Sequence, residues 1–201
     1  MSALGIAAVH RRSAGGRPPS YRRRRRVATR AACFAAVTGG ILAGVTPLPR
    51  FHIVLVQPEI PQNTGNIGRT CVALGAKLWL VRPLGFRLDN HRLERAGMDY
   101  WTHLDWEAVD SWAALLAETP VGAARRWFFT KTAARRYTDA AFRPGDALVF
   151  GSESGGLPPS LMADAGDAAL QLPMREEARS LNLSSCVAAA AYEALRQMDS
   201  V

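Results

Sequence analysis

Two short apolar segments, separated by one helix-length stretch, most constrain the fold of this chain. Phe51–Val56 (FHIVLV) and Lys77–Val81 (KLWLV) are rich in β-branched and large apolar residues, and each is closely followed by a proline. Such runs are typical of buried strands. The stretch between them predicts a helix that is capped by Asn63 and stopped by Gly75. A strand, a helix and a strand in this order indicate a βαβ unit with parallel strands.

The later sequence continues the alternation of strands and helices. Helices are expected near His91–Ala96 and Val109–Ala117, and further strands at Trp127–Thr130, Ala147–Phe150 and Ala168–Leu172. The clearest helix is Ser184–Gln197, which is alanine-rich, apolar over most of its circumference and capped by Ser184. We expect it to be buried, within the domain or against a partner subunit. The whole pattern predicts an α/β fold with a parallel sheet flanked by helices.

The basic charge is concentrated at the amino-terminal end. Of the 25 Lys and Arg residues in the 201-residue chain, ten arginines lie in residues 1–50, which contain no acidic residue. Residues 51–201 therefore hold 15 basic and 17 acidic residues, a formal charge of −2. Net charge thus gives no argument for a nucleic-acid partner, which would need the remaining arginines to gather on one face.

We expect residues 1–50 to be a basic extension and residues 51–198 to form one domain. His10–Arg30 lacks the apolar residues of a core, so disorder is predicted there. Ala31–Val45 is uncharged but too short to span a bilayer, and no membrane association is predicted. Three origins stay open for the extension: a targeting peptide, an RNA-contacting arm, or the product of a misplaced start codon. The abrupt change of composition at Phe51 favours the last.

Neither the cysteines nor the histidines form a metal-site pattern. Cys33, Cys71 and Cys186 are far apart, and the four histidines are scattered. No zinc-type ligand spacing or disulfide framework results. We therefore expect a cytoplasmic protein without a bound metal, in which Cys71 and Cys186 are core residues of apolar helices.

The strongest local motif is PEIPQNTGNIGR, residues 58–69, where the first predicted strand meets the first predicted helix. Ligands of open α/β sheets usually bind at such a junction. Gly65 and Gly68 allow a backbone or a ligand to come close, Asn63 offers an amide, and Arg69 offers a planar group with five donors. The alternative is a simple helix cap and a surface arginine. The motif is neither a Walker A loop nor a dinucleotide-binding Gly-x-Gly-x-x-Gly.

Two further polar segments follow predicted strands. FGSESGGLP, residues 150–158, combines three glycines with the lone carboxylate of Glu153, which is more suggestive of a site than of a passive turn. LPMREEARSLNLS, residues 172–184, carries Ser180, Asn182 and Ser184. These side chains can hold a small polar ligand, or they form a helix cap and a solvated loop.

Together, and in this order, the three motifs resemble those of the SPOUT superfamily of RNA methyltransferases. The resemblance is strongest to the small, single-domain bacterial enzymes that methylate the ribose 2′-hydroxyl of the tRNA wobble nucleotide, a cytidine or uridine at position 34. It runs from PEIPQNTGNIGR at residue 58 through AGMDYW to SLNLSSCVAAAAYE, which ends at residue 193. Two positions depart from the pattern of these enzymes: Gly155, where arginine is frequent, and Ser185, where asparagine is usual.

The resemblance implies a fold, a cofactor and partners. The sheet would carry a C-terminal deep trefoil knot, an exception to the rule that chains do not thread loops. The protein would be a homodimer with shared active sites, acting on tRNA with S-adenosylmethionine as methyl donor. Seven residues would bind this cofactor, with the register at Phe129–Lys131 open by one residue: Phe129, Thr130, Gly151, Glu153, Leu172, Ser180 and Asn182.

By the same resemblance, Arg69 and Asn63 would be the catalytic residues. The ribose 2′-oxygen would attack the sulfonium methyl in line, so the protein mainly aligns the reactants and assists proton removal, without a metal. Arginine keeps its proton and is a poor base. Arg69 would therefore stabilise the developing alkoxide directly, or position a substrate phosphate or neighbouring base that relays the proton.

Five arginines are candidates for contacting RNA phosphates if they share one face: Arg82, Arg87, Arg92, Arg95 and Arg135. Taken singly, each is more typical of a solvated surface. Two other functions stay open. One is ribose methylation of ribosomal RNA or of another tRNA position by the same fold, and the other is that of a catalytically silent RNA-binding protein.

Overall fold

The computed structural model describes residues 48–87, 99–163 and 165–199. The chain divides into two units, Met1–Val45 and Thr46–Val201, and all described elements belong to the second. Several predictions lie outside the described residues: the disorder of His10–Arg30, the helix at His91–Ala96, and the RNA contacts of Arg92 and Arg95.

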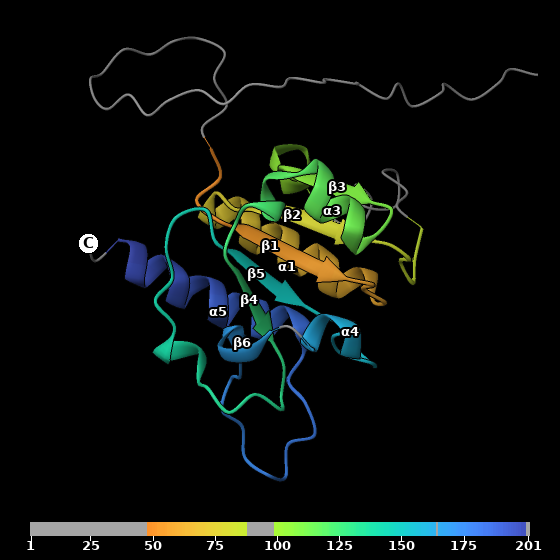
Figure 1. Ribbon diagram of the computed structural model, residues 1–201. Helices are drawn as coiled ribbons and strands as arrows, with labels where there is room; N and C mark the ends of the chain where they lie inside the picture. The colour runs from red at the N-terminus through yellow and green to blue at the C-terminus, as the bar shows by residue number, and fades with distance from the viewer. Residues whose placement is uncertain (1–47, 88–98, 164, 200–201) are drawn as a thin grey trace, which may run out of the picture. The chain divides into compact units, whose positions relative to one another are not determined.

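A parallel sheet of six strands forms the centre of the fold, in the order β3-β2-β1-β5-β4-β6 (Figure 1). The strands are β1 (His52–Val56), β2 (Lys77–Val81), β3 (Trp106–Val109), β4 (Arg126–Phe129), β5 (Ala147–Phe150) and β6 (Ala169–Leu170). All neighbours pair in parallel, which confirms the predicted sheet. Because β2 and β3 lie on one side of β1 and the later strands on the other, the order changes direction between β1 and β5. Ligands of open α/β sheets bind at such a point.

Helices cover both faces of the sheet. They are α1 (Pro61–Leu74), α3 (Trp112–Glu118), α4 (Pro159–Met162) and α5 (Leu183–Met198). Short 3-10 turns are η1 (Asp99–His103), η2 (Pro120–Gly122), η3 (Tyr137–Asp139) and η4 (Gly166–Ala168). α1 and α5 pack against each other on one face, whereas α3 and α4 lie on the other (Figure 1).

The core is split between the two faces because successive side chains of a strand point to opposite sides. In β1, Ile53 and Leu55 pack toward α1 and α5, and Val54 and Val56 pack toward the opposite layer. All four are 3% exposed or less. β1 is thus buried on both faces, which explains its continuous apolar sequence.

Two predicted helix caps are wrong. α1 begins at Pro61 with Ile60 as its N-cap, so Asn63 lies inside the helix and not at its cap. α5 is capped by Asn182 and not by Ser184, because the Asn182 Oδ1 accepts from the N–H groups at the start of the helix. The stop at Gly75 is confirmed: its φ of 66° is the left-handed conformation that glycine adopts without strain.

The edges of the sheet differ from the prediction as well. Val109 ends β3 and does not start a helix; α3 begins only at Trp112, with Ser111 as its cap. β3 is an edge strand in which only Val109 is buried, so its sequence WEAV lacks the apolar run of an inner strand. At the opposite edge, β6 has two residues and is shorter than the predicted Ala168–Leu172.

Candidate active site

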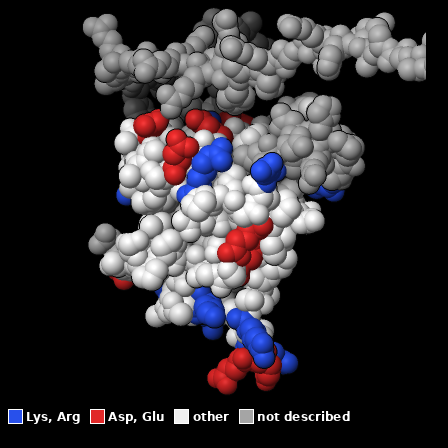
Figure 2. Space-filling view, turned by 90° about the vertical axis from the view of Figure 1, so that its right-hand side faces the viewer, with Lys and Arg blue, Asp and Glu red and all other residues white. Residues whose placement is uncertain are grey.

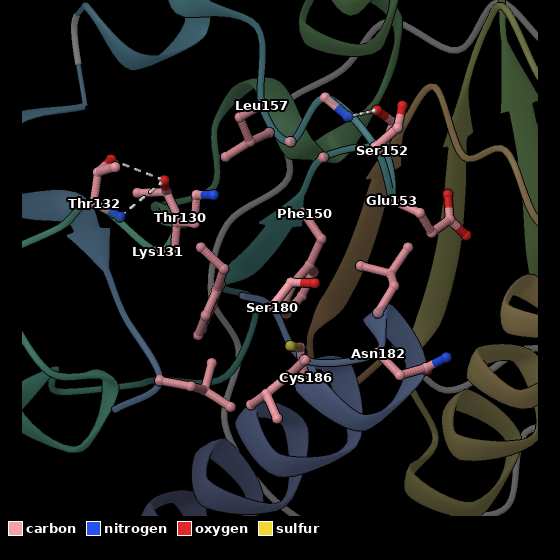
Figure 3. A pocket seen from close by; sticks show the side chains of 18 of the residues that line it. Thr130, Lys131, Thr132, Phe150, Ser152, Glu153, Leu157, Ser180, Asn182 and Cys186 are labelled. Carbon is pink, nitrogen blue, oxygen red and sulfur yellow. Dashed lines mark hydrogen bonds between the residues drawn. The ribbon is translucent and has the colours of Figure 1, made fainter. Parts of the chain in front are cut away.

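The three polar segments singled out in the sequence meet at the carboxyl end of the sheet. They follow β1, β5 and β6, and together with the residues after β4 they line a cavity of about 790 Å³. This volume lies within the usual range of small-molecule sites, roughly 300–1,000 Å³. Figure 3 shows Thr130, Lys131 and Thr132 on one side of the cavity, Ser152 and Glu153 on another, and Ser180, Asn182 and Cys186 on a third.

Glu153 holds the amino-terminal end of α1. Its Oε2 accepts from the Glu59 N–H at 2.8 Å, and its Oε1 accepts from the Ile60 N–H at 3.2 Å and from the Asn63 Nδ2 at 2.9 Å. The N-cap residue Ile60 has no capping side chain; a carboxylate 93 positions later in the chain instead accepts from the N–H groups of Ile60 and of the residue before it. A carboxylate is favoured there because a helix N-terminus carries unpaired N–H groups and a positive partial charge.

A second glutamate makes the reverse contact. Glu59 Oε2 accepts from the Ser154 N–H at 3.1 Å, and its Oε1 accepts from the Ser154 Oγ at 2.6 Å. Glu59 and Glu153 therefore each bind the segment that carries the other. This pair fixes the residues after β5 against the start of α1.

Asn63 joins the first polar segment to the third. Its Nδ2 donates to Glu153, and its Oδ1 accepts from the Asn182 Nδ2 at 2.9 Å. Asn63 is only 5% exposed, and both ends of its amide are paired. Asn182 in turn caps α5. We call these contacts the Glu153–Asn63–Asn182 link; it ties three segments that are far apart in the sequence to one edge of the cavity.

Gly151 is required by a close approach of backbone to backbone. A Cβ atom at this position would lie 2.0 Å from the carbonyl carbon of Gly156 and 2.2 Å from the Leu157 nitrogen. The turn is closed by two backbone hydrogen bonds between Ser152 and Gly156, at 3.1 and 3.0 Å. The glycine-rich segment is thus folded back on itself along the cavity wall. The fold requires glycine at position 151 whether or not a ligand is bound.

Two stacked aromatic rings form an apolar part of the wall. Phe129 ends β4 and Phe150 ends the adjacent β5; their ring centroids are 4.5 Å apart and their planes are inclined by 15°. Leu172 and Cys186 also line the cavity. Apolar walls edged by hydroxyl and amide groups suit a ligand with a flat apolar part and polar ends.

The cavity gathers most of the predicted site residues. Its lining includes Phe129, Thr130, Gly151, Glu153, Leu172, Ser180, Asn182 and the predicted catalytic Asn63. Thr130, Lys131 and Thr132 are all among the lining residues, so the register left open at this segment does not change its place in the site. Which of these side chains touch a cofactor stays a prediction.

Arg69 lies apart from this group. It follows Asn63 by six residues in α1, about 9 Å further along the helix axis, and it does not line the cavity. Its side chain is exposed, and its guanidinium carbon lies over the ring of Tyr100, 4.8 Å from the centroid. One chain therefore does not bring the two predicted catalytic residues to the same cavity.

The predicted RNA-contacting arginines within the described ranges are spread over the domain. Arg82 and Arg87 are exposed. Arg135 donates to two backbone carbonyls and lies over the Trp127 ring, 5.4 Å from its centroid, so its guanidinium supports its own loop. Figure 2 shows Lys and Arg on the viewed side as separate groups and not as one continuous patch. Binding of RNA by these arginines stays a prediction.

Two charged residues of the site, Glu59 and Arg179, were not predicted, and Lys131 was included only through the open register of its segment. Lys131 and Arg179 line the cavity, both are exposed, and neither forms an ion pair within the part of the chain that the structure describes. Glu59 makes the contact with Ser154. Each lies within or directly beside a segment that the sequence analysis singled out. Their position next to these motifs could therefore have identified them as site residues.

The cysteines divide between core and cavity. Cys71 is fully buried, and burial raises the pKa of its thiol to about 12, so the predicted core role is confirmed. Cys186 packs against the same core but is only partly buried and lines the cavity; burial raises the pKa of its thiol too, which keeps it neutral. Within the described ranges, no three His, Cys, Asp or Glu residues are grouped so that they could hold a metal ion. Across the same ranges, no helix is long and apolar enough to cross a membrane.

Comparison with known proteins identifies the family. Residues 50–192 match the SpoU rRNA Methylase family. The chain belongs to this family. A relative of this SpoU chain from Burkholderia pseudomallei, named tRNA (cytidine(34)-2'-O)-methyltransferase, is 46% identical over 148 residues, which are 73% of this chain and 95% of the relative. Membership in the SpoU family confirms the resemblance to the SPOUT methyltransferases.

Solved structures agree with this assignment. One that concerns the 2-OH methylation of C/U34 on tRNA is 48% identical, covers 75% of the SpoU chain and 97% of its own, and has a TM-score of 0.70. An AdoMet-bound rRNA methyltransferase from Sinorhizobium meliloti is 25% identical, covers 76% of the SpoU chain and 58% of its own, and has a TM-score of 0.65. The fold described above is therefore that of SPOUT methyltransferases.

Replacing Glu153 by Gln should loosen the wall of the cavity in this SpoU chain. Glutamine keeps one acceptor oxygen but turns an NH₂ group toward the N–H groups at the start of α1, so a hydrogen bond and the charge at the helix N-terminus are both lost. We expect the free energy of unfolding, measured by urea denaturation, to fall by about 1–3 kcal/mol. Glu176→Gln, at an exposed carboxylate of the third polar segment, is the matched control. Equal stability of the two variants would contradict the role of Glu153 in holding the start of α1.

Proposed function

We propose that this protein transfers a methyl group from S-adenosylmethionine to the ribose 2′-hydroxyl of nucleotide 34, the wobble position, in tRNA. One observation carries the proposal: the Glu153–Asn63–Asn182 link joins the three motifs around a single cavity. The choice of substrate is supported by relatives named for this position, which are 46% and 48% identical and align over nearly their whole length.

The cavity residues fit S-adenosylmethionine chemically. The stacked phenylalanines at the ends of β4 and β5, together with Leu172, offer a flat apolar surface to an adenine ring. Thr130 and Ser180 offer hydroxyl groups to the ribose and to the amino-acid end, while Asn182, whose amide is paired with Asn63 and with the start of α5, holds the wall beside them. Gly151 lets the folded-back turn stand close to the ligand. The AdoMet-bound relative from Sinorhizobium meliloti supports the same cofactor.

Glu153 takes an indirect part in this proposal. Its two carboxylate oxygens already accept three hydrogen bonds from the start of α1. Figure 3 shows the carboxylate pointing away from Phe150 and Ser180, although the residue lines the cavity. We therefore assign Glu153 to shaping the cavity wall and not to a direct hydrogen bond with the cofactor.

When bound, S-adenosylmethionine supplies an electrophilic methyl group. The residues of the chain then have to hold the 2′-oxygen in line with that methyl, which is mainly a matter of alignment. Because arginine keeps its proton at physiological pH, Arg69 orients the hydroxyl or its neighbouring phosphate and stabilises negative charge on the 2′-oxygen. The proton leaves through a substrate phosphate or neighbouring base.

We further propose a homodimer with shared active sites. Two observations support it: Arg69 does not line the cavity of its own chain, and Tyr192, a large aromatic residue of α5, is 55% exposed. A second copy packed on this side would cover Tyr192 and carry its own Arg69 to the first chain's cavity. The isologous contact of a two-fold dimer would complete both sites equally.

We also propose the deep trefoil knot of the SPOUT fold for the segments after β4, β5 and β6. The strand order supports it. β6 pairs with the outer side of β4, and the chain then has to pass back across the sheet to α5, which packs against α1 and β5. The segment between β6 and α5 passes the edge of the sheet at which the turns after β4 and β5 lie. The chain would cross these turns there and so form the knot.

For the RNA we propose contacts at the mouth of the cavity. Lys131 and Arg179 are exposed there, and their charge would meet the phosphates on either side of the target ribose. Arg82 and Arg87, which are exposed, and Arg92 and Arg95 are candidates for more distant phosphates. A tRNA substrate would place the protein in the cytoplasm.

Methyl transfer to synthetic tRNA tests the proposed function. With S-adenosylmethionine, we expect one methyl group per tRNA, mapped by mass spectrometry to the ribose of nucleotide 34. A matched tRNA with 2′-deoxycytidine at position 34 lacks the attacking hydroxyl and should accept none. Ribosomal RNA is the second candidate, because the family is described as rRNA methylases and because Gly155 and Ser185 depart from the wobble-enzyme pattern. Methylation of ribosomal RNA, or of the deoxy control, would overturn the assignment to position 34.

Mixing two strongly impaired variants tests the shared site. Arg69→Ala removes the guanidinium, and Thr130→Trp fills the cavity; each alone should keep only a residual activity, measurable but far below a quarter of that of the wild type. A mixed dimer has one cavity that is intact and faces an intact Arg69. Random exchange of subunits makes half of the dimers mixed, so about a quarter of wild-type activity should return on mixing. No recovery, with subunit exchange verified by mass spectrometry, would mean that Arg69 acts within its own chain.

A further inference from the structure

We propose that Tyr100 is a positioning residue that fixes the direction of the Arg69 guanidinium, and that the η1 turn serves as a brace for it. This inference rests on the proposed function, since it gives Arg69 a task that needs a defined direction. The two side chains come from different elements, α1 and η1, which are separated by more than 30 residues in the sequence.

The contact between Tyr100 and α1 involves both ends of the tyrosine side chain. Its hydroxyl donates to the Gly65 carbonyl oxygen at 2.8 Å. Its ring lies under Arg69, whose guanidinium carbon is 4.8 Å from the ring centroid. Gly65 is four residues before Arg69, so its carbonyl is the helical acceptor of the Arg69 N–H. The tyrosine therefore spans one turn of α1. Its hydroxyl binds the carbonyl that accepts from the Arg69 N–H, and its ring contacts the Arg69 side chain.

The brace is itself held firmly against α1. The neighbouring Trp101 is 8% exposed, and a Cβ atom on Gly68 would come within 2.9 Å of its ring. Leu104 lies equally close to Gly68, at 3.0 Å from such a Cβ. Because Gly68 has no side chain, η1 can pack closely against α1 at this position. Trp101 also contacts Trp106 of β3, with ring centroids 5.5 Å apart. Gly68 was predicted to admit a backbone or a ligand; in the structure it admits this brace.

An arginine needs such support to act by alignment. Its side chain has several rotatable bonds, and Arg69 is exposed, so without a neighbour its planar fork would sample many directions. Stacking on an aromatic face restricts the plane of the guanidinium as well as its position. Because small misplacements of a catalytic group lower rates strongly, loss of the ring should affect turnover more than loss of the hydroxyl.

A double-mutant cycle with tRNA methylation as readout tests this role. Tyr100→Leu removes the ring and should lower kcat at least about tenfold, whereas Tyr100→Phe keeps the ring and should lower it only a few-fold. The affinity for S-adenosylmethionine, measured by calorimetry, should not change in either variant. In an Arg69→Ala background, Tyr100→Leu should cause no further loss. Trp112→Leu, a half-buried aromatic on the opposite face of the sheet, controls for general destabilisation and should leave kcat unchanged.

A second measurement does not depend on enzymatic activity. Nitrogen-15 relaxation of the Arg69 Nε–H in the full chain should report a restricted side chain in the wild type and a mobile one in Tyr100→Leu, with Trp112→Leu resembling the wild type. Equal mobility in all three proteins would overturn the positioning role, whatever the substrate proves to be. Equal mutational losses from Tyr100→Leu with and without Arg69 would overturn it as well. If the relaxation result holds but no RNA is methylated, the contact stands and the proposed function fails.

Discussion

The carboxylate of Glu153 at the start of α1 is the contact on which the rest of the site depends. α1 begins at Pro61 after the N-cap Ile60, and neither residue offers a capping side chain. The N–H groups of Glu59 and Ile60, directly before the helix, donate to this carboxylate from a distant part of the sequence. The same carboxylate orients the Asn63 amide, and Asn63 orients Asn182. The start of α1, the turn after β5 and the start of α5 are therefore mutually dependent, and the cavity exists only where all three are in place.

α1 carries two polar residues that lie in different surroundings. Asn63 at its beginning belongs to the cavity, and Arg69, further along, belongs to an exposed surface that η1 braces. A helix fixes the spacing of these two positions at about 9 Å along its axis. On the proposed function, Arg69, which does not line the cavity of its own chain, would serve the cavity of a second copy. The exposed Tyr192 on α5 fits the same arrangement.

Local sequence predicted the interior of the fold better than its edges. β1 and β2 were predictable because strands buried on both faces need unbroken apolar runs, whereas the edge strand β3, with one buried residue, carries no such signal. The three motifs predicted most of the residues that line the cavity, because the carboxyl ends of parallel strands lie at the same edge of the sheet. The sequence did not predict how the polar groups pair. Asn63 is a residue type typical of an N-cap, but it lies inside α1 and its amide donates to Glu153, which only the folded chain brings to the start of the helix.

A crystal structure with S-adenosylhomocysteine, the product of the donor, tests the central claim most directly. The account predicts the adenosine against the stacked rings of Phe129 and Phe150, with Ser180 and Asn182 near its polar groups and with Glu153 still accepting from the Ile60 N–H. A ligand bound elsewhere, or a Glu153 carboxylate that leaves α1 to bind the ligand, would contradict it.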